Sequence, residues 1–278
     1  FEGLFSLVQI FVAMNPEETK YFANPGPDGV FNEKFQFHWA DFNNNPINQW
    51  SEVVKHLLSI PMAHQLIGYY TVADDSDGVL KVMRSYQYYA ASRISDRVTV
   101  IDRDKLWGTK GLKGGFVWHT TGSGKTMTSF KCAQLIANSK DADKVVFLVD
   151  RIELGTQSLE QYRSFADDSE AVQATESTDV LKAKLKSGDP SDTLIVTSIQ
   201  KMGNIDEDAM SARDLETIRK KRIVFIVDEC HRSTFGKNME TIKRVFPGAL
   251  MFGFTGTPIH EENRKKLSTT TDVFGDEL

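Results

Sequence analysis

One stretch of the sequence, residues 115–126, constrains the fold more than any other. Four apolar or small residues at 115–118 precede a loop that contains Gly122 and Gly124, and a helical pattern begins after Lys125-Thr126. A glycine-rich turn between a strand and a helix lets successive backbone amides point at phosphate oxygens, and the helix N-terminus adds partial positive charge. The stretch therefore predicts an α/β fold with a phosphate-binding loop at the carboxyl end of a strand.

Residues within this loop predict contacts to ATP and Mg²⁺. Lys125 is expected to bridge the β- and γ-phosphates, and the Thr126 hydroxyl is expected to bind Mg²⁺. The complete phosphate-loop pattern has glycine six positions before the lysine, where this chain has His119. A chance Lys-Thr pair after a glycine turn is the alternative, which the flanking strand and helix disfavour. The other predicted nucleotide-binding positions of the loop are Thr121, Gly122, Ser123 and Gly124.

From about residue 76 onward, short apolar segments alternate with helical ones. Continuous apolar runs are typical of parallel strands that are buried on both faces. We expect strands at 115–118, 145–149, 194–197, 223–227 and 250–254, and helices at 126–138, 153–165, 179–185, 209–220 and 239–245. This alternation predicts a parallel sheet with helices on both faces.

The predicted strand at 223–227 leads directly into two carboxylates, Asp228 and Glu229. Parallel strands present their carboxyl ends to the ligand crevice, so both side chains are expected near the phosphate loop. Asp228 is expected to hold Mg²⁺ through water, and Glu229 is expected to orient and polarise the attacking water. With Lys125 they are the predicted catalytic residues. Cys230 and His231 follow, but a structural zinc site needs four ligands, so we do not expect one here.

Two further segments are assigned to the same site. The strand at 250–254 leads into Thr255, Gly256 and Thr257, which are expected to sense the γ-phosphate and couple its state to the rest of the protein; a simple turn closed by Pro258 is the alternative. Gln87 is expected to recognise adenine, because an amide can donate to and accept from the N6/N7 edge of that base. A glutamine on an amphipathic helix is the alternative for Gln87.

The residues before about 75 differ in composition and are assigned to a separate domain. We expect a strand within 5–13, a hairpin within 21–37, helical structure over 53–70 interrupted near Pro61, and a linker at 74–78. The chain has no initiator methionine, so we expect it to be part of a longer protein.

Charge limits how the chain can bind nucleic acid. It has 33 Lys and Arg against 38 Asp and Glu, a net charge of −5, so only local patches could attract DNA or RNA. The runs 220–222 and 264–266 are candidates, although such runs are commonly solvated loop charge. Cys132 and Cys230, without an export signal or a long apolar run, indicate free thiols, a cytoplasmic location and no membrane partner.

Three of these motifs, taken in order, resemble a known family. Gly-Ser-Gly-Lys-Thr at 122–126, Asp-Glu-Cys-His at 228–231 and Thr-Gly-Thr-Pro at 255–258 resemble motifs I, II and III of superfamily 2 helicases and translocases. The wording at 86–90, 118–121, 147–151, 195–202, 231–233 and 269–272 resembles the motor subunit of type I restriction endonucleases, over nearly the whole chain.

The resemblance implies a RecA-like ATPase domain at 76–278. At 1–75 it implies an α+β remnant of an N-terminal nuclease domain, without that domain's catalytic residues. It also implies ATP-driven translocation of double-stranded DNA before endonucleolytic cleavage, in a complex with methyltransferase and specificity subunits. By position, the residues that fall in segments lining the DNA track are Asp150, Arg151, Thr197, Ser198 and Gln200.

Two alternatives to this motor stay open. Another superfamily 2 DNA or RNA motor would share the three motifs. The chain could also be a nucleotide-binding module without turnover, because the resemblance implies a second RecA-like domain with an arginine finger, which we do not recognise within 1–278. The isolated chain is therefore expected to hydrolyse ATP barely or not at all.

Overall fold

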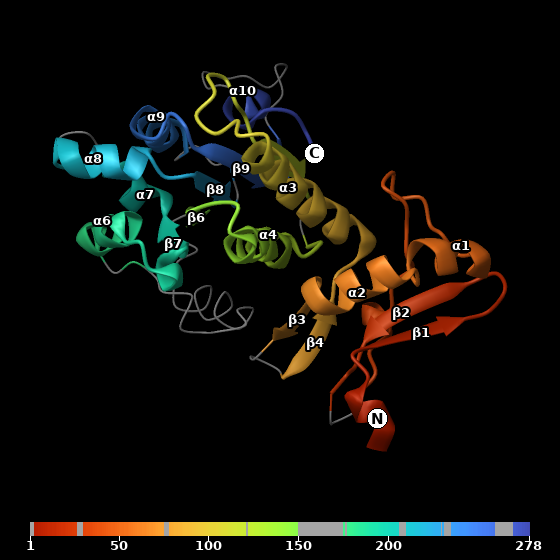
Figure 1. The fold of residues 1–278 in the computed structure, drawn as a ribbon. Helices are drawn as coiled ribbons and strands as arrows, with labels where there is room; N and C mark the ends of the chain where they lie inside the picture. The colour runs from red at the N-terminus through yellow and green to blue at the C-terminus, as the bar shows by residue number, and fades with distance from the viewer. Residues whose placement is uncertain are drawn as a thin grey trace. The chain divides into compact units, whose positions relative to one another are not determined.

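Five of the short apolar segments form one parallel sheet in the computed structural model, in the spatial order β5-β9-β8-β6-β7 (Figure 1). The first strand of this sheet thus lies beside the last, as in RecA-like folds, and the predicted fold class is confirmed. The strands are β5 (Gly115–Trp118), β6 (Lys144–Val149), β7 (Leu194–Ser198), β8 (Ile223–Val227) and β9 (Leu250–Thr255).

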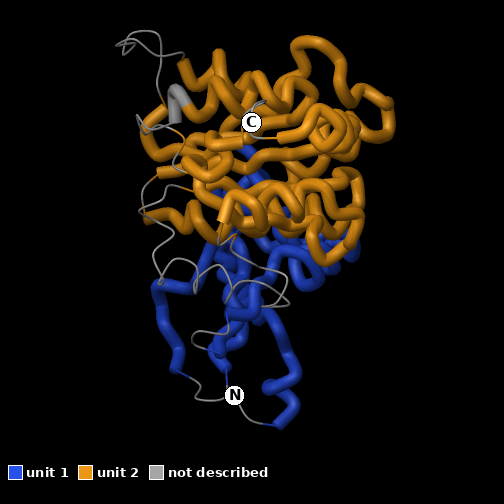
Figure 2. Tube along the Cα trace, turned by 90° about the vertical axis from the view of Figure 1, so that its left-hand side faces the viewer, with its two compact units in different colours: residues 1–91 blue, residues 92–278 orange. Residues whose placement is uncertain are grey.

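The chain divides into two compact units, residues 1–91 and 92–278 (Figure 2). The structure describes residues 3–26, 30–74, 78–120, 122–149, 175, 177–205, 210–228, 230, 235–258 and 269–278, with only the backbone at 235–237. The boundary between the units falls within helix α3 (Ser85–Arg103). Among the described helices, none is both long and apolar enough to cross a membrane.

Helices cover both faces of the sheet, as predicted, and the helix expected at 153–165 lies outside the described residues. On one face, Val146 and Leu148 of β6 belong to a buried cluster with side chains of five helices. On the other face, Phe130 of α4 (Lys125–Ser139) packs edge-on against Phe147 with ring centroids 5.8 Å apart. Figure 1 shows α4 and α9 on opposite sides of the strands. The five helices of the first face are α6 (Thr178–Lys186), α7 (Ile199–Gly203), α8 (Ala212–Arg219), α9 (Phe235–Val245) and α10 (Thr270–Phe274).

The described part of the first unit contains two antiparallel hairpins and two separate helices before α3. Strands β1 (Ile10–Met14) and β2 (Thr19–Ala23) form one hairpin, and β3 (Thr71–Asp74) and β4 (Val79–Val82) form the other. Helices α1 (Trp50–His56) and α2 (Ile60–Tyr69) lie between them in the sequence. The unit has an α+β composition, and its assignment to a nuclease domain stays a prediction.

Three local expectations for this unit need correction. The strand expected from residue 5 starts only at Ile10, because residues 3–7 form a 3-10 turn. The hairpin expected within 21–37 is a single bridge between Tyr21 and Phe37, since β2 pairs with β1 instead. The linker expected at 74–78 is wrong, because Asp74 ends β3 and its partner strand β4 begins at Val79.

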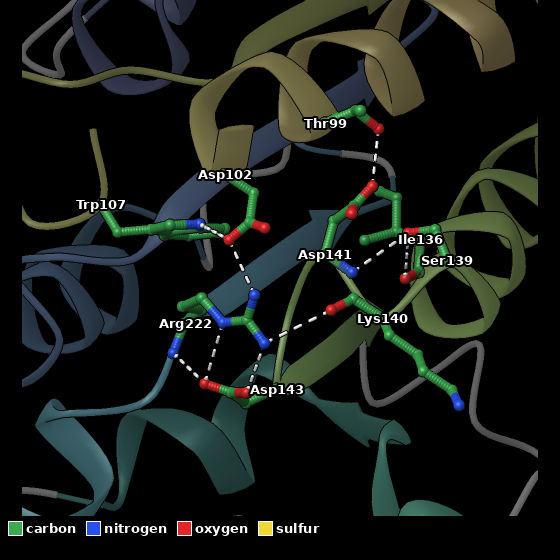
Figure 3. A network of polar contacts seen from close by, with 9 residues as sticks. All are labelled: Thr99, Asp102, Trp107, Ile136, Ser139, Lys140, Asp141, Asp143 and Arg222. Carbon is green, nitrogen blue, oxygen red and sulfur yellow. Dashed lines mark hydrogen bonds and ion pairs between the residues drawn. The ribbon is translucent and has the colours of Figure 1, made fainter. Parts of the chain in front are cut away.

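In the second unit, a polar network surrounds Arg222, which directly precedes β8. It links Arg222 to the end of α3 and to the loop before β6 (Figure 3). The guanidinium donates to Asp143 (Nη2 to Oδ1, 2.7 Å) and to Asp102 (Nη1 to Oδ1, 2.7 Å), and the backbone amide of Arg222 donates to Asp143 Oδ2 at 2.8 Å. Trp107 Nε1 donates to the same Asp102 oxygen at 3.0 Å. Although burial acts to raise it, hydrogen bonds from Arg222 hold the pKa of Asp143 below its usual value.

The three basic side chains of the run 220–222 therefore bind groups of the protein itself. Lys221 Nζ donates to the carbonyl of Lys186 at 2.8 Å, and Lys220 Nζ lies 2.7 Å from Glu216 Oε1. All three cations precede β8, whereas Asp228 follows it, so the run lies at the opposite edge of the sheet from the predicted ATP site. This arrangement favours the structural interpretation over a nucleic-acid patch. The run 264–266 lies outside the described residues.

Replacing Arg222 with glutamine should lower the free energy of unfolding of the chain by about 1–3 kcal/mol. The glutamine amide cannot replace the planar fork that binds two carboxylates, although partial exposure of the network limits the loss. Chemical denaturation followed by far-UV circular dichroism measures this change. Lys220→Gln is the matched control, because its exposed pair with Glu216 is screened by solvent and should contribute little to stability. Equal effects of the two substitutions would contradict a stabilising role for the network.

Candidate nucleotide-binding site

The loop between β5 and α4 has the backbone shape that phosphate binding requires. Gly122 (φ +79°) and Gly124 (φ +85°) adopt left-handed conformations, which side chains with a Cβ disfavour. Gly124 is the N-cap of α4 and has no side chain that could cap the helix. The first turn of any α-helix contains amides without intrahelical partners, and these are the donors that bind phosphate. Thr121 lies outside the described residues.

Lys125 and Asp228, which are 103 residues apart in the sequence, meet at the carboxyl edge of the sheet. Lys125 Nζ lies 3.5 Å from Asp228 Oδ1, and the two side chains are only 11% and 2% exposed. The Asp228 amide donates to the carbonyl of Leu148 at 3.0 Å, which fixes its backbone to β6. Burial of an ion pair is weakly favourable at best, so the pair indicates a binding site more than a stabilising device. Glu229 lies outside the described residues.

The end of β9 is hydrogen-bonded to Cys230, the residue that follows the acidic pair. The Cys230 amide donates to the carbonyl of Phe254 at 3.1 Å, and the Thr257 amide donates to Thr255 Oγ1 at 3.1 Å. Burial, with a smaller contribution from the charge of Asp228, raises the pKa of the Cys230 thiol to about 12. Neither Cys230 nor Cys132 is in a disulfide, as predicted. The Thr255–Thr257 segment therefore lies beside the acidic motif, as its predicted coupling role requires.

The end of β9 is also bound to the start of the phosphate loop. The His119 amide donates to the carbonyl of Thr255 at 2.8 Å, and Trp118 Nε1 donates to the carbonyl of Gly256 at 3.1 Å. His119 is only 4% exposed, and burial, together with repulsion from Lys125, lowers its pKa to about 4. Sequence reasoning gave no role to Trp118 or His119. The departure from glycine at position 119 was the available signal.

These residues fit ATP with Mg²⁺. A buried ammonium suits phosphate oxygens, while the carboxylate of Asp228 and the hydroxyl of Thr126 are the oxygen ligands that Mg²⁺ prefers. Thr126 is in the first turn of α4, next to Lys125. The predicted ligands for phosphate and for metal are thus supplied by adjacent positions of one helix and by the end of β8.

Comparison with known proteins identifies the family. Residues 86–278 match the family model of the SWI2/SNF2 ATPase. The chain belongs to the SWI2/SNF2 ATPase family. The matched residues include Gln87 and all three motifs, which are the phosphate loop, the acidic pair and the Thr255–Thr257 segment.

The resemblance of this SWI2/SNF2 ATPase to type I restriction endonuclease subunits is confirmed. The SsaAORF53P subunit of Staphylococcus saprophyticus is 37% identical over 276 residues, 99% of this chain and 28% of that protein. A C-terminal part of such a subunit from Mycoplasma pneumoniae is 38% identical over 208 residues, 75% of this chain and 99% of that protein. The chain thus spans 28% of the length of the longer relative.

A solved nuclease-deletion mutant of the type ISP restriction-modification enzyme LlaGI, in complex with a DNA substrate mimic, is also similar. It is 19% identical, and the match covers 70% of this chain and 19% of that one, with a TM-score of 0.43. The assignment of the SWI2/SNF2 family does not depend on this likeness.

Three further predicted site residues of this SWI2/SNF2 domain are engaged within the fold. Gln87 is buried, and its Oε1 accepts from the Arg84 amide at 3.0 Å, which caps the start of α3. Thr197 and Ser198 are also buried: Thr197 Oγ1 lies 2.6 Å from Thr175 Oγ1, and Ser198 Oγ accepts from the Lys201 amide. Adenine recognition and DNA contact by these side chains stay predictions.

Two groups of predicted DNA contacts remain to be placed. Gln200 is the second residue of α7, two positions after the capping residue Ser198, and is partly buried. Asp150 and Arg151 lie outside the described residues. Among the described residues, the structure therefore brings Lys125 and Asp228 together, and the predicted contacts with DNA stay predictions.

Proposed function

We propose that this chain is the ATP-binding motor domain of a type I restriction enzyme, which couples ATP hydrolysis to translocation of double-stranded DNA before endonucleolytic cleavage. The observation that carries the proposal is the buried contact of 3.5 Å between Lys125 Nζ and Asp228 Oδ1, beside a left-handed glycine loop at a helix N-terminus. The family match and the restriction endonuclease relatives support it.

In this function, the side chains divide the work of phosphoryl transfer. Lys125 holds the β- and γ-phosphates. Thr126 would bind Mg²⁺ through its hydroxyl, and Asp228 would bind it through water. When bound, Mg²⁺ neutralises charge that develops on the phosphate oxygens. Glu229 orients and polarises the attacking water. Thr255, Gly256 and Thr257 lie beside the acidic motif and couple the state of the γ-phosphate to the rest of the chain. Gln87 recognises adenine.

The partners follow from the same relationship. Double-stranded DNA is the track, contacted by residues in the segments that contain Asp150, Arg151, Thr197, Ser198 and Gln200, and methyltransferase and specificity subunits complete the complex. The unit of residues 1–91 belongs to an N-terminal nuclease domain, and the unit of residues 92–278 contains the first RecA-like domain. The buried positions of Thr197 and Ser198 imply that their contacts to DNA require a change of conformation.

The chain should bind a fluorescent ATP analogue, and Mg²⁺ should strengthen the binding. Thr126→Val removes one predicted metal ligand at nearly constant volume, so the Mg²⁺-dependent part of the affinity should fall about tenfold, the scale of lost metal-site groups. Ser139→Ala is the control, because Ser139 ends α4, where its hydroxyl donates to the Ile136 carbonyl (3.0 Å) and accepts from the Asp141 amide (3.3 Å). Affinity that is equal with Mg²⁺ and with a chelator would contradict the proposed metal site.

A further inference from the structure

We propose that His119 is a positioning residue of the nucleotide site, whose ring joins the tip of the phosphate loop to helix α4 through both of its nitrogens. This proposal rests on the proposed function, because it concerns how the same loop is held ready for phosphate. It gives a role to the one position at which the loop departs from the glycine pattern.

Distances within the loop carry the proposal. His119 Nδ1 lies 2.5 Å from Ser123 Oγ, and Nε2 lies 3.3 Å from Thr128 Oγ1. Ser123 stands between the two left-handed glycines, and Thr128 is one turn into α4. Because the His119 amide also donates to the carbonyl of Thr255, this residue connects β9, the loop and the helix. The buried ring is therefore placed to restrain the glycine-containing part of the loop, residues 122–124.

The Ser123 hydroxyl favours one tautomer. Ser123 Oγ donates to the carbonyl of Thr120, so it accepts from a protonated Nδ1. The Thr128 hydroxyl donates to the carbonyl of Gly124 at 3.0 Å, and its 3.3 Å contact with Nε2 is the weaker of its two contacts. A neutral ring satisfies this arrangement, and the lowered pKa of His119 agrees with it.

Restraint of the loop should act on nucleotide affinity more than on the chemical step. Gly122 and Gly124 permit many backbone conformations, and binding must otherwise select the one that faces phosphate. The ring makes that selection in advance, for ADP as well as for ATP, since both carry the phosphates that the loop surrounds. Its loss should therefore raise the dissociation constant for ADP and KM for ATP together.

Equilibrium binding of fluorescent ADP and steady-state ATP hydrolysis by the intact subunit test the role. His119→Ala should raise the ADP dissociation constant and KM about tenfold, as expected for two lost neutral hydrogen bonds, while kcat falls much less. His119→Asn keeps a donor at the position of Nδ1 and should recover most of the loss. Adding Ser123→Ala to His119→Ala should cost little more, because the shared hydrogen bond is already absent.

Gln134→Ala is the matched control, since it removes another buried side-chain hydrogen bond of α4, from Lys131 Nζ at 3.0 Å, outside the loop. It should lower Tm without changing ADP affinity. If His119→Ala does not fold, Thr128→Val, which removes one contact, should raise both constants about threefold. Unchanged affinity in folded His119 and Thr128 variants would overturn the positioning role alone. A parent protein that binds no nucleotide would overturn the proposed function and this role with it.

Discussion

Replacing Lys125 with alanine in the intact subunit should abolish ATP-dependent translocation on duplex DNA. The γ-phosphate would lose its main point charge, in a site that is shielded from water and where charge interactions are strong. We expect phosphate release below about 1% of the parent rate, on the scale of a lost electrostatic donor. Phosphate release and movement along duplex DNA are the two measurements.

The same substitution disturbs the fold, so it needs a partner control. Removing Lys125 leaves the carboxylate of Asp228 buried without the ammonium 3.5 Å away, which can cost about 3–5 kcal/mol. The double variant Lys125→Ala with Asp228→Asn removes that stranded charge and should regain much of the Tm. It should still be inactive. Normal translocation by either folded variant would contradict the motor assignment.

Glu229→Gln should separate nucleotide binding from hydrolysis. The amide keeps the shape of the side chain but cannot polarise water as a carboxylate does. We expect kcat to fall by about 10²-fold or more, while the dissociation constant for ATP changes little. Single-turnover hydrolysis and equilibrium binding of ATP, measured on the same preparation, give the two values.

Glu216→Gln provides the control for Glu229→Gln. It neutralises a carboxylate of α8 that forms an exposed pair with Lys220, and it should leave turnover unchanged. If Glu229→Gln also turned over normally, Glu229 would not be the catalytic carboxylate, and Asp228 would be the remaining candidate of the acidic pair.

The strands of the sheet were predictable because they are buried on both faces. A strand of that kind is continuously apolar, so β5 and β8 have the predicted bounds and the other three strands begin or end within one residue of them. The hairpin of β3 and β4 was not predictable in this way. The sequence after Asp74 is acidic, which is typical of a linker. The antiparallel pairing of β3 with β4, from Thr71 with Val82 to Asp74 with Val79, becomes visible only in the structure.

The sequence predicts which segments form the site, but it predicts only part of how their side chains are arranged. Parallel strands place their carboxyl ends together, which explains why Lys125 and Asp228 meet despite their separation in the sequence. The role of His119 depends on the path of the loop, which brings Ser123 and Thr128 to opposite sides of one ring. Sequence spacing carries no information about that path.

The charges of 220–222 could not be assigned from sequence for a related reason. A run of cations before a buried strand can face solvent or bind carboxylates that approach from elsewhere in the chain. Arg222 does the latter, because Asp143 precedes β6, the neighbour of β8, and Asp102 lies in the last turn of α3 (Figure 3). Which carboxylates lie within reach is set by the order of the strands, and that order is a property of the whole sheet.

Phosphate release by the intact subunit, with and without duplex DNA, tests the proposed function most directly. An ATP-driven translocase should hydrolyse ATP faster on duplex DNA, should show no such acceleration with RNA of the same length, and should lose the response in Lys125→Ala. Acceleration by RNA rather than DNA would support a different superfamily 2 motor. No hydrolysis with either nucleic acid, in a subunit that binds ATP, would contradict the motor and leave a nucleotide-binding module.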